Sequence, residues 1–239
     1  AMHNQKPPFD DIHVRRAINH LIDKQEIVEN QLQGYGTVAK TPIPGTNWAY
    51  SDDVRTYPFS IDDAKAELDQ SNHANGFSTT ILTQQSQVQE NMALQLQNNM
   101  QEIGIEAEIT KKPYAQWYGA FRDGNFEIMS TVYGADFPDP SGLLYPWYTS
   151  FNLPPDGVNY FYYENEEFDS VVSDAKQSYD RGERKELYAE AQSILQEDVP
   201  HALTHHTQQV MPHQQSVEGF TLNPMYYWRH YLKKSYLTE

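Results

Sequence analysis

The middle of the chain alternates strand and helix patterns, and this order constrains the fold more than any other feature. Strand patterns occupy residues 77–83, 105–109 and 126–133, where β-branched, aromatic or alternating apolar residues gather. Between them, residues 88–103 place apolar side chains on one helical face, and a short helical pattern begins at Pro113. The order β-α-β-α-β predicts parallel strands with right-handed crossovers, and therefore an α/β layer.

Helical patterns also lie on both sides of this alternation. Asp11 precedes an apolar stripe of helical period, which predicts a helix start there. Ser60 begins a capping-box-like pattern for a short helix through Leu68. Two further helices are predicted from about Asn165 and about Gly182. The layer should therefore be covered by helices from both ends of the chain.

Two long stretches, 41–58 and 134–160, are rich in Pro, Gly and polar residues and have no period, so we predict loops there. A loop as long as the second one is usually functional when it lies inside a compact domain. Residues 201–211 should be extended. Residues 212–239 hold many aromatic side chains but little helical period.

Composition excludes several classes of protein. The 239 residues carry 33 acidic and 17 basic side chains, a formal net charge of −16. A surplus of negative charge argues against binding nucleic acid or anionic lipid. The absence of cysteine removes disulfides, thiolate metal sites and thiol nucleophiles. No run approaches the ~18 apolar residues that a membrane span requires.

Asp136 and Asp139 stand three residues apart in the motif DFPDP and are the clearest candidate for chemistry. Such carboxylates can cap turns, bind a cation or an ammonium group, or act as an acid–base pair. Pro138 and Pro140 stiffen the loop, and the sequence offers no evident partner base. Turn capping and cation or ammonium binding are therefore both favoured over catalysis.

Four histidines, at positions 201, 205, 206 and 213, cluster near the end of the chain. On a strand, His201 and His205 would share a face and His206 would point away, which is poor geometry for a metal. The sequence also lacks the HExxH metal motif and the GxSxG nucleophile elbow. We therefore expect structural or exposed histidines in preference to metal ligands.

A family resemblance rests on six sequence blocks. The segment HNQKPPFDDIHVRRAINHLIDKQEIV resembles the helix that opens the second lobe of the family 5 extracellular solute-binding proteins, the peptide- and nickel-binding receptors of ABC importers. Further matches follow in order: DDAKAEL, LQNNMQEIGIEAEI, FEIMSTVYGADFPDP, NEEFDSVVSDA and ERKELYAEAQSILQEDVP. Each block alone is a soft signal, but six in the right order with compatible spacing are a strong one.

The resemblance implies a fold and a domain division. Family members are longer and fold as two lobes joined by hinge strands. This chain would be an α/β lobe of the type II periplasmic-binding-protein kind, with a mixed sheet flanked by helices. Residues 1–207 would form the second lobe, and 208–239 would be a return segment that completes the first lobe. The hinge strands would lie near 2–5 and 204–208. The abrupt start, without a signal-like segment, fits a fragment that lacks the first lobe.

The resemblance also implies ligand-binding residues. Oligopeptide-binding members hold an extended ligand between the lobes through main-chain hydrogen bonds. Asp136, within YGAD, would pair with the α-ammonium group of a peptide. Trp117 would wall a side-chain pocket, and Tyr133 matches an aromatic position where the family often has Trp. Val132 would offer backbone groups, and Gly134 is assigned to the ligand site beside it.

The implied function is substrate capture for an ABC importer, without catalysis, cofactor or metal. The expected partners are a peptide or small-molecule solute, a membrane permease and the missing first lobe. The expected location is extracytoplasmic, with a lipid anchor on the full-length parent. Two alternatives stay open: a nickel, metallophore or sugar receptor of the same fold, and a peptide-sensing signalling receptor. No basic residue beside Asp136 clearly suits a peptide carboxylate, and such a residue could lie on the absent lobe.

Overall fold

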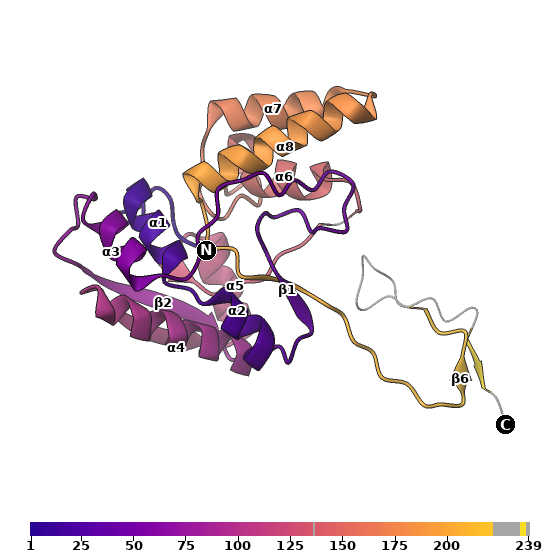
Figure 1. Cartoon of the computed structure of the whole chain (residues 1–239), viewed down its shortest axis with the longest axis horizontal. Coiled ribbons are helices and arrows are strands. Elements are labelled where there is room, and N and C mark those ends of the chain that lie inside the picture. Colours follow the sequence, from indigo (N-terminus) through magenta and orange to yellow (C-terminus); the bar gives the residue numbers. More distant parts are fainter. Residues whose placement is uncertain (136, 222–234, 238–239) are drawn as a thin grey trace.

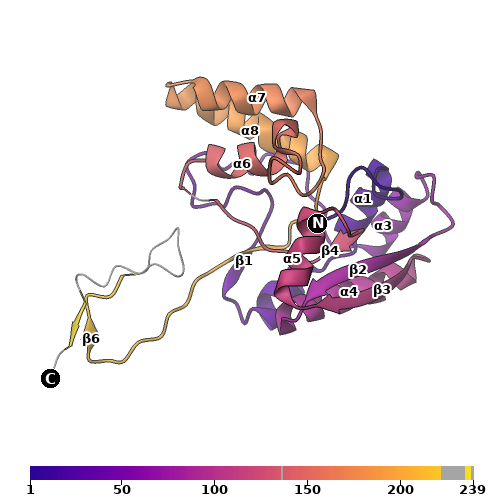
Figure 2. The same ribbon diagram turned by 180° about the vertical axis from the view of Figure 1, so that it is seen from behind.

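The structure is a computed structural model that describes residues 1–135, 137–221 and 235–237. Up to about β5 (His205–Thr207), the chain forms one body of helices around a central sheet. The segment that follows extends away from this body (Figures 1 and 2). Within the described residues, no helix is both long enough and apolar enough to cross a membrane.

The central sheet confirms the predicted β-α-β-α-β layer. Its strands β2 (Ser78–Gln84), β3 (Glu106–Lys112) and β4 (Ile128–Met129) are parallel and lie in the order β3-β2-β4. Helix α4 (Gln87–Glu102) connects β2 to β3, and α5 (Tyr114–Arg122) connects β3 to β4 (Figure 1). Strand β2 therefore lies between β3 and β4. The chain crosses from β2 to β3 through α4, and from β3 to β4 through α5.

The first residues of the chain make the sheet mixed, as predicted. Met2 forms an antiparallel bridge with Ile128. The backbone N–H of Met129 donates to the carbonyl of Ala1 at 2.9 Å, and that of His3 donates to the carbonyl of Glu127 at 3.1 Å. The start of the chain thus covers the edge of the sheet that β4 would otherwise expose.

Strand β4 is shorter than predicted: the sequence indicated a strand over residues 126–133, but the strand covers only Ile128–Met129. Pairing with β2 continues one residue beyond β4, where the N–H of Ser130 donates to the carbonyl of Leu82 at 3.0 Å. The carbonyl of Ser130 then accepts the indole N–H of Trp117 at 3.1 Å. The chain leaves the sheet at this point.

The sheet separates two hydrophobic cores, because successive side chains of a strand point to opposite faces. Ile81 and Ile128 lie in a first core, whereas their neighbours Leu82 and Met129 lie in a second core. The first core contains helices α1 (Ile12–His20), α3 (Ile61–Leu68) and α4; the second contains α5, α6 (Ser141–Tyr148), α7 (Glu166–Gln177) and α8 (Arg181–Asp198). Figures 1 and 2 show α6, α7 and α8 as one group, apart from the group of α1, α3 and α4.

Side-chain caps define the helix starts, and they confirm the predicted helices. The side chains of Asp11, Ser60 and Asn165 accept backbone N–H groups two or three residues ahead, at 2.9 to 3.0 Å. Asp180 does the same for α8, which begins at Arg181, one residue before the predicted start near Gly182. Helix α1 is followed by the short α2 (Lys24–Glu26) and a π-helical turn (Ile27–Gln31).

The predicted loop over 134–160 is wrong in part, because it contains α6 and a short 3-10 turn (Ser150–Asn152). Pro140 stands at the N-cap, a place next to the first turn where a missing N–H costs little. Pro146 lies inside the helix. Burial of apolar side chains such as Leu144 in the second core outweighs the helix-breaking tendency of this proline. The loop over 41–58 is confirmed.

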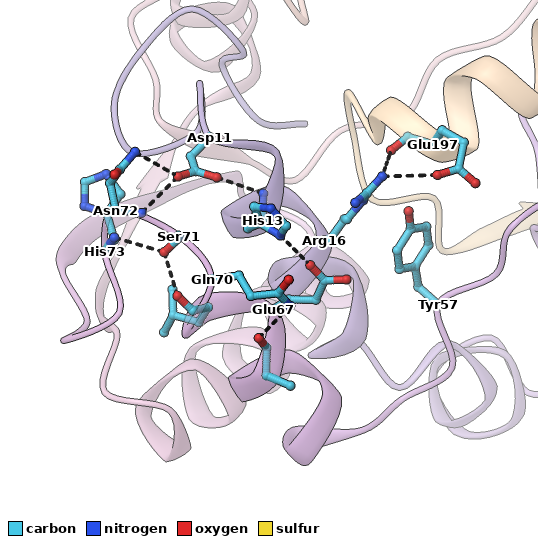
Figure 3. A network of polar contacts seen from close by, with 12 residues as sticks. Asp11, His13, Arg16, Tyr57, Glu67, Gln70, Ser71, Asn72, His73 and Glu197 are labelled. Carbon is cyan, nitrogen blue, oxygen red and sulfur yellow. Dashed lines mark hydrogen bonds and ion pairs between the residues drawn. The ribbon is translucent and has the colours of Figure 1, made fainter.

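A polar network joins the two groups of helices at their surface (Figure 3). Arg16 of α1 contacts Glu197 of α8 at 3.1 Å, and His13 contacts Glu67 of α3 at 2.8 Å. Arg55, from the long loop, contacts both of these glutamates. The network therefore connects α1, α3 and α8 through one loop.

Two short antiparallel ribbons complete the described structure. Strand β1 (Gly36–Val38) pairs with β5 (His205–Thr207), and β6 (Val217–Glu218) pairs with β7 (Tyr236–Leu237). The predicted division between a lobe and a return segment at residue 207 stays a prediction.

Candidate functional site

The candidate site is the segment 131–135, which extends beyond the carboxyl end of β4. Ligands of open α/β sheets bind at this end of the strands. Within the described chain, the N–H groups of residues 131–135 donate no hydrogen bond to another backbone carbonyl. The side chain of Val132 is 70% exposed. The segment therefore leaves backbone N–H groups without a backbone partner among the described residues, and the predicted role of Val132 in ligand binding stays a prediction.

Trp117 contacts the residue that precedes this segment. Its side chain is only 3% exposed, and its indole N–H donates to the carbonyl of Ser130. Two exposed tyrosines of α5 that sequence reasoning did not single out surround it: Tyr114 lies 5.7 Å from the Trp117 ring and stacks on Tyr118 at 6.1 Å. Helical spacing of these aromatics could have indicated this surface. The predicted role of Trp117 as a pocket wall stays a prediction.

Tyr133 points its hydroxyl into the protein, where it meets Tyr148 and His201. The Nε2 atom of His201 lies 2.8 Å from the Tyr133 hydroxyl and 3.0 Å from the Tyr148 hydroxyl, and the two hydroxyls contact each other. Burial raises the pKa of both tyrosines and lowers the pKa of His201 well below its usual range. All three side chains are therefore neutral near pH 7, and the cluster ties the candidate segment to the residues that follow α8.

Gly134 begins the loop that carries the DFPDP motif. Its carbonyl accepts the indole N–H of Trp147 on α6 at 3.2 Å. The Trp147 ring also lies 5.1 Å from the ring of Tyr133. Helix α6, which sequence analysis missed, thus contacts the start of the loop through Trp147.

The two aspartates of the loop have different standing. Asp136 lies outside the described residues, so its predicted contact with an ammonium group stays a prediction. Asp139 is described: both of its carboxylate oxygens lie 2.7 Å from Nη2 of Arg184, and one accepts the N–H of Ser141 at 3.0 Å. Burial on its own would raise the pKa of Asp139, but hydrogen bonds from Arg184 and Ser141 outweigh it and hold the pKa below its ordinary value. Asp139 is thus an ionised carboxylate with a partner at each oxygen.

The histidines near the end of the chain contact their own surroundings. The Nδ1 atom of His205 lies 3.0 Å from the Thr204 hydroxyl, and Nε2 of His206 lies 3.0 Å from the Thr41 carbonyl. Burial lowers the pKa of both histidines. His201 faces Tyr133. Across the described ranges, no three His, Cys, Asp or Glu side chains come together as a metal site would require.

Comparisons with known proteins show which family the chain resembles. The model of the bacterial extracellular solute-binding proteins, family 5, matches residues 1–155. Heme-binding protein A of Haemophilus influenzae is 30% identical over 95% of this chain and 42% of its own length. The dipeptide-binding protein of Escherichia coli is 28% identical over 92% of this chain and 42% of its own length.

A solved structure supports the same assignment. The ABC transporter-associated periplasmic binding protein DppA from Helicobacter pylori, in complex with the peptide STSA, superposes with a TM-score of 0.91 at 28% identity. The match covers 100% of this chain and 46% of that one, so the chain spans less than half the length of these relatives. Since the family match covers well over half of the sequence and the fold agrees, this chain belongs to the family 5 bacterial extracellular solute-binding proteins.

Proposed function

We propose that this chain is the second lobe of a receptor that captures peptides for an ABC importer, and that its ligands carry a free amino terminus. The observation that carries the proposal is the segment 131–135, whose backbone N–H groups are unpaired within the described chain and which leads directly into Asp136. Two of the similar proteins support a peptide ligand, one through its name and one through the peptide in its structure.

The proposed recognition has a backbone part and a charge part. An extended peptide would hydrogen-bond to the segment 131–135 as an added strand does, so that affinity depends little on side-chain identity. The carboxylate of Asp136 would pair with the α-ammonium group. A buried ammonium needs such a partner, since breaking a buried ion pair by removing one member costs about 3–5 kcal/mol.

The proposed whole protein has two lobes. Residues 1–207 would form one of them, residues 208–239 would return to complete the other, and a first lobe would close over the ligand before delivery to the permease. The length of the relatives supports a further lobe, since the chain matches only 42% to 46% of their lengths. We place the receptor outside the cytoplasm with a lipid anchor on the parent protein, and assign it no catalytic step.

The test uses the full-length parent, purified without denaturation, then unfolded so that mass spectrometry identifies what it releases. We expect a ladder of short peptides with free amino termini. The Asp136→Asn variant should fold with an unchanged melting temperature and release far less peptide. Release of nickel, a chelate or a sugar instead of peptides would keep the fold and overturn the proposed ligand.

A further inference from the structure

A cavity of about 70 Å³ lies between α1, α4 and the end of β4. Apolar side chains of the first core form most of its lining, among them Ile18 on α1 and both Ala93 and Leu96 on α4. Trp117, by contrast, belongs to the second core, on the other face of the sheet. The cavity is therefore separate from the surface around Trp117.

Two hydroxyl groups at this cavity have no partner. Ser130 and Thr131 line the cavity, and the side-chain oxygens of both are buried without a hydrogen bond among the described residues. The hydroxyl of Thr204, which also lines the cavity, lies 3.0 Å from Nδ1 of His205. A buried hydroxyl without a partner costs free energy, so the two unpaired groups favour a bound molecule that can pair with them.

The cavity adjoins the segment to which we assign the peptide backbone. Ser130 directly precedes the segment 131–135, and Thr131 is its first residue. A peptide that pairs with this segment as an added strand directs alternate side chains towards the protein, where pockets give specificity. One of those side chains would point into the cavity.

The volume of the cavity limits what it can hold. An apolar cavity of about 150 Å³ in another protein holds one benzene ring. The present cavity has close to half that volume, so it accommodates about three heavy atoms. The side chains of valine and threonine have this size. Threonine also carries a hydroxyl group, which can pair with the hydroxyl of Ser130 or Thr131.

We propose that this cavity is a subsite for one small branched side chain of the ligand, valine or threonine, with threonine preferred. This inference rests on the proposed function. Backbone pairing gives affinity without regard to side chains, and the cavity adds a preference at one position. The apolar lining favours valine over alanine, because more apolar surface leaves water. The unpaired hydroxyls favour threonine over valine, since valine leaves both oxygens without a partner.

The test offers the full-length parent three pools of tripeptides with free amino termini. The pools are X-Ala-Ala, Ala-X-Ala and Ala-Ala-X, where X is Ala, Val, Thr or Phe. Equilibrium dialysis with mass spectrometry measures each bound peptide relative to Ala-Ala-Ala in the same pool. In one pool we expect Val to be enriched about tenfold, as two more buried carbon atoms imply. Thr should exceed Val about threefold there, and Phe should fall below Ala because it overfills the cavity.

Two variants assign the preference to this cavity. Ala93→Leu places a larger side chain in the cavity and should bring Val and Thr to within about twofold of Ala. The double change Ser130→Ala with Thr131→Val removes both unpaired hydroxyls, so the melting temperature should not fall, and Thr should lose its advantage over Val. Ala66→Leu, at an exposed position on α3, is the matched control and should keep both preferences.

The outcomes separate this subsite from the proposed function. Peptides that bind without a preference for Val or Thr in any pool would overturn the subsite alone. A preference that persists in Ala93→Leu would arise elsewhere in the parent and would overturn it too. If Ala93→Leu does not fold, the double variant decides, because an advantage of Thr that persists there contradicts the subsite. A parent that binds no peptide of any pool would overturn the proposed function itself.

Discussion

The two cores on either side of the sheet are built from different side chains. Among the described residues, Phe9 is the one aromatic side chain in the buried part of the first core, whose other members are aliphatic residues and methionine. The second core is rich in aromatic residues, and its buried tyrosine hydroxyls have specific partners: Tyr163 donates to Asp198 at 2.6 Å, and Tyr148 contacts His201 at 3.0 Å.

This difference separates stability from positioning. Burial of apolar side chains is non-directional, so the first core stabilises the fold without fixing the position of any one group. A buried hydroxyl loses free energy unless its partner lies in the right direction, so the second core also dictates orientation. The candidate segment contacts this second core through Tyr133, and Arg184 contacts it through the hydroxyl of Tyr188. The comparison predicts that a cavity in the first core lowers the free energy of unfolding and leaves the candidate segment unchanged. Polar changes in the second core should affect the candidate segment itself.

The largest expected effect on stability comes from the first core. Leu68 of α3 is fully buried, and Leu68→Ala leaves a cavity among aliphatic neighbours that cannot fully collapse. We expect the free energy of unfolding to fall by about 2–5 kcal/mol in a denaturant titration. Peptide affinity of the parent, measured where the variant is still folded, should be unchanged. A variant that keeps its stability but loses affinity would reverse the roles of the two cores.

Much of the fold, though not its division into two cores, could be predicted from the sequence, because local signals agree with the tertiary structure. The apolar stripe of α1, the caps at Asp11 and Ser60 and the order of the central layer are short-range patterns that tertiary packing reinforces. Helix α6 was missed because its prolines are local breakers, and its stability comes from burial against residues far along the chain.

The polar contacts of the site were harder to predict than its place. The motif YGAD indicated the site, and the structure places the segment 131–135, which includes its first three residues, just beyond the end of β4. No local pattern, however, indicates that Arg184 lies against Asp139, 45 residues away, or that His201 meets Tyr133. Such pairs depend on how α8 packs, which a single sequence does not encode in any short window.

The second expected effect is a pH dependence of the free energy of unfolding, which arises from two histidines beside the second core. Burial lowers the pKa of His201 far below its ordinary value near 6.5, and burial with the nearby Lys6 lowers that of His3 to about 4. These residues stay neutral in the folded chain but take up protons when it unfolds below pH 6.5, so acid favours the unfolded state. Stability should therefore be full above pH 6.5 and fall as the pH drops towards 4.

Replacing one of these histidines should flatten the pH dependence. In His201→Gln, the slope of the unfolding free energy between pH 6 and 4.5 should decrease by up to about 1.4 kcal/mol per pH unit, the value for one proton. Denaturant titrations at several pH values measure it. The change His213→Gln, at an exposed position, should keep the original slope. Equal slopes in all three proteins would mean that His201 does not resist protonation.

A third, smaller effect should follow from removing one hydroxyl of the second core. Tyr148→Phe keeps the ring, which is fully buried and stacks on Phe161 with ring centres 5.3 Å apart. His201 keeps its contact with Tyr133, so we expect a loss of only about 1 kcal/mol in the free energy of unfolding. Peptide affinity of the parent should nevertheless fall, since the segment 131–135 loses part of its support. Unchanged affinity would show that the cluster acts on stability alone.

The smallest effect should come from the surface network that joins the two groups of helices (Figure 3). Glu197 is 52% exposed at its side chain and contacts both Arg16 and Arg55. Exposed ion pairs contribute little because water and salt screen them, so Glu197→Gln should lower the free energy of unfolding by about 0.5 kcal/mol at low ionic strength. In 1 M salt the difference from the unchanged chain should disappear. A loss that persists in high salt would mean that these contacts do more than attract opposite charges. The interface between the two groups of helices, rather than either core, would then determine the free energy of unfolding.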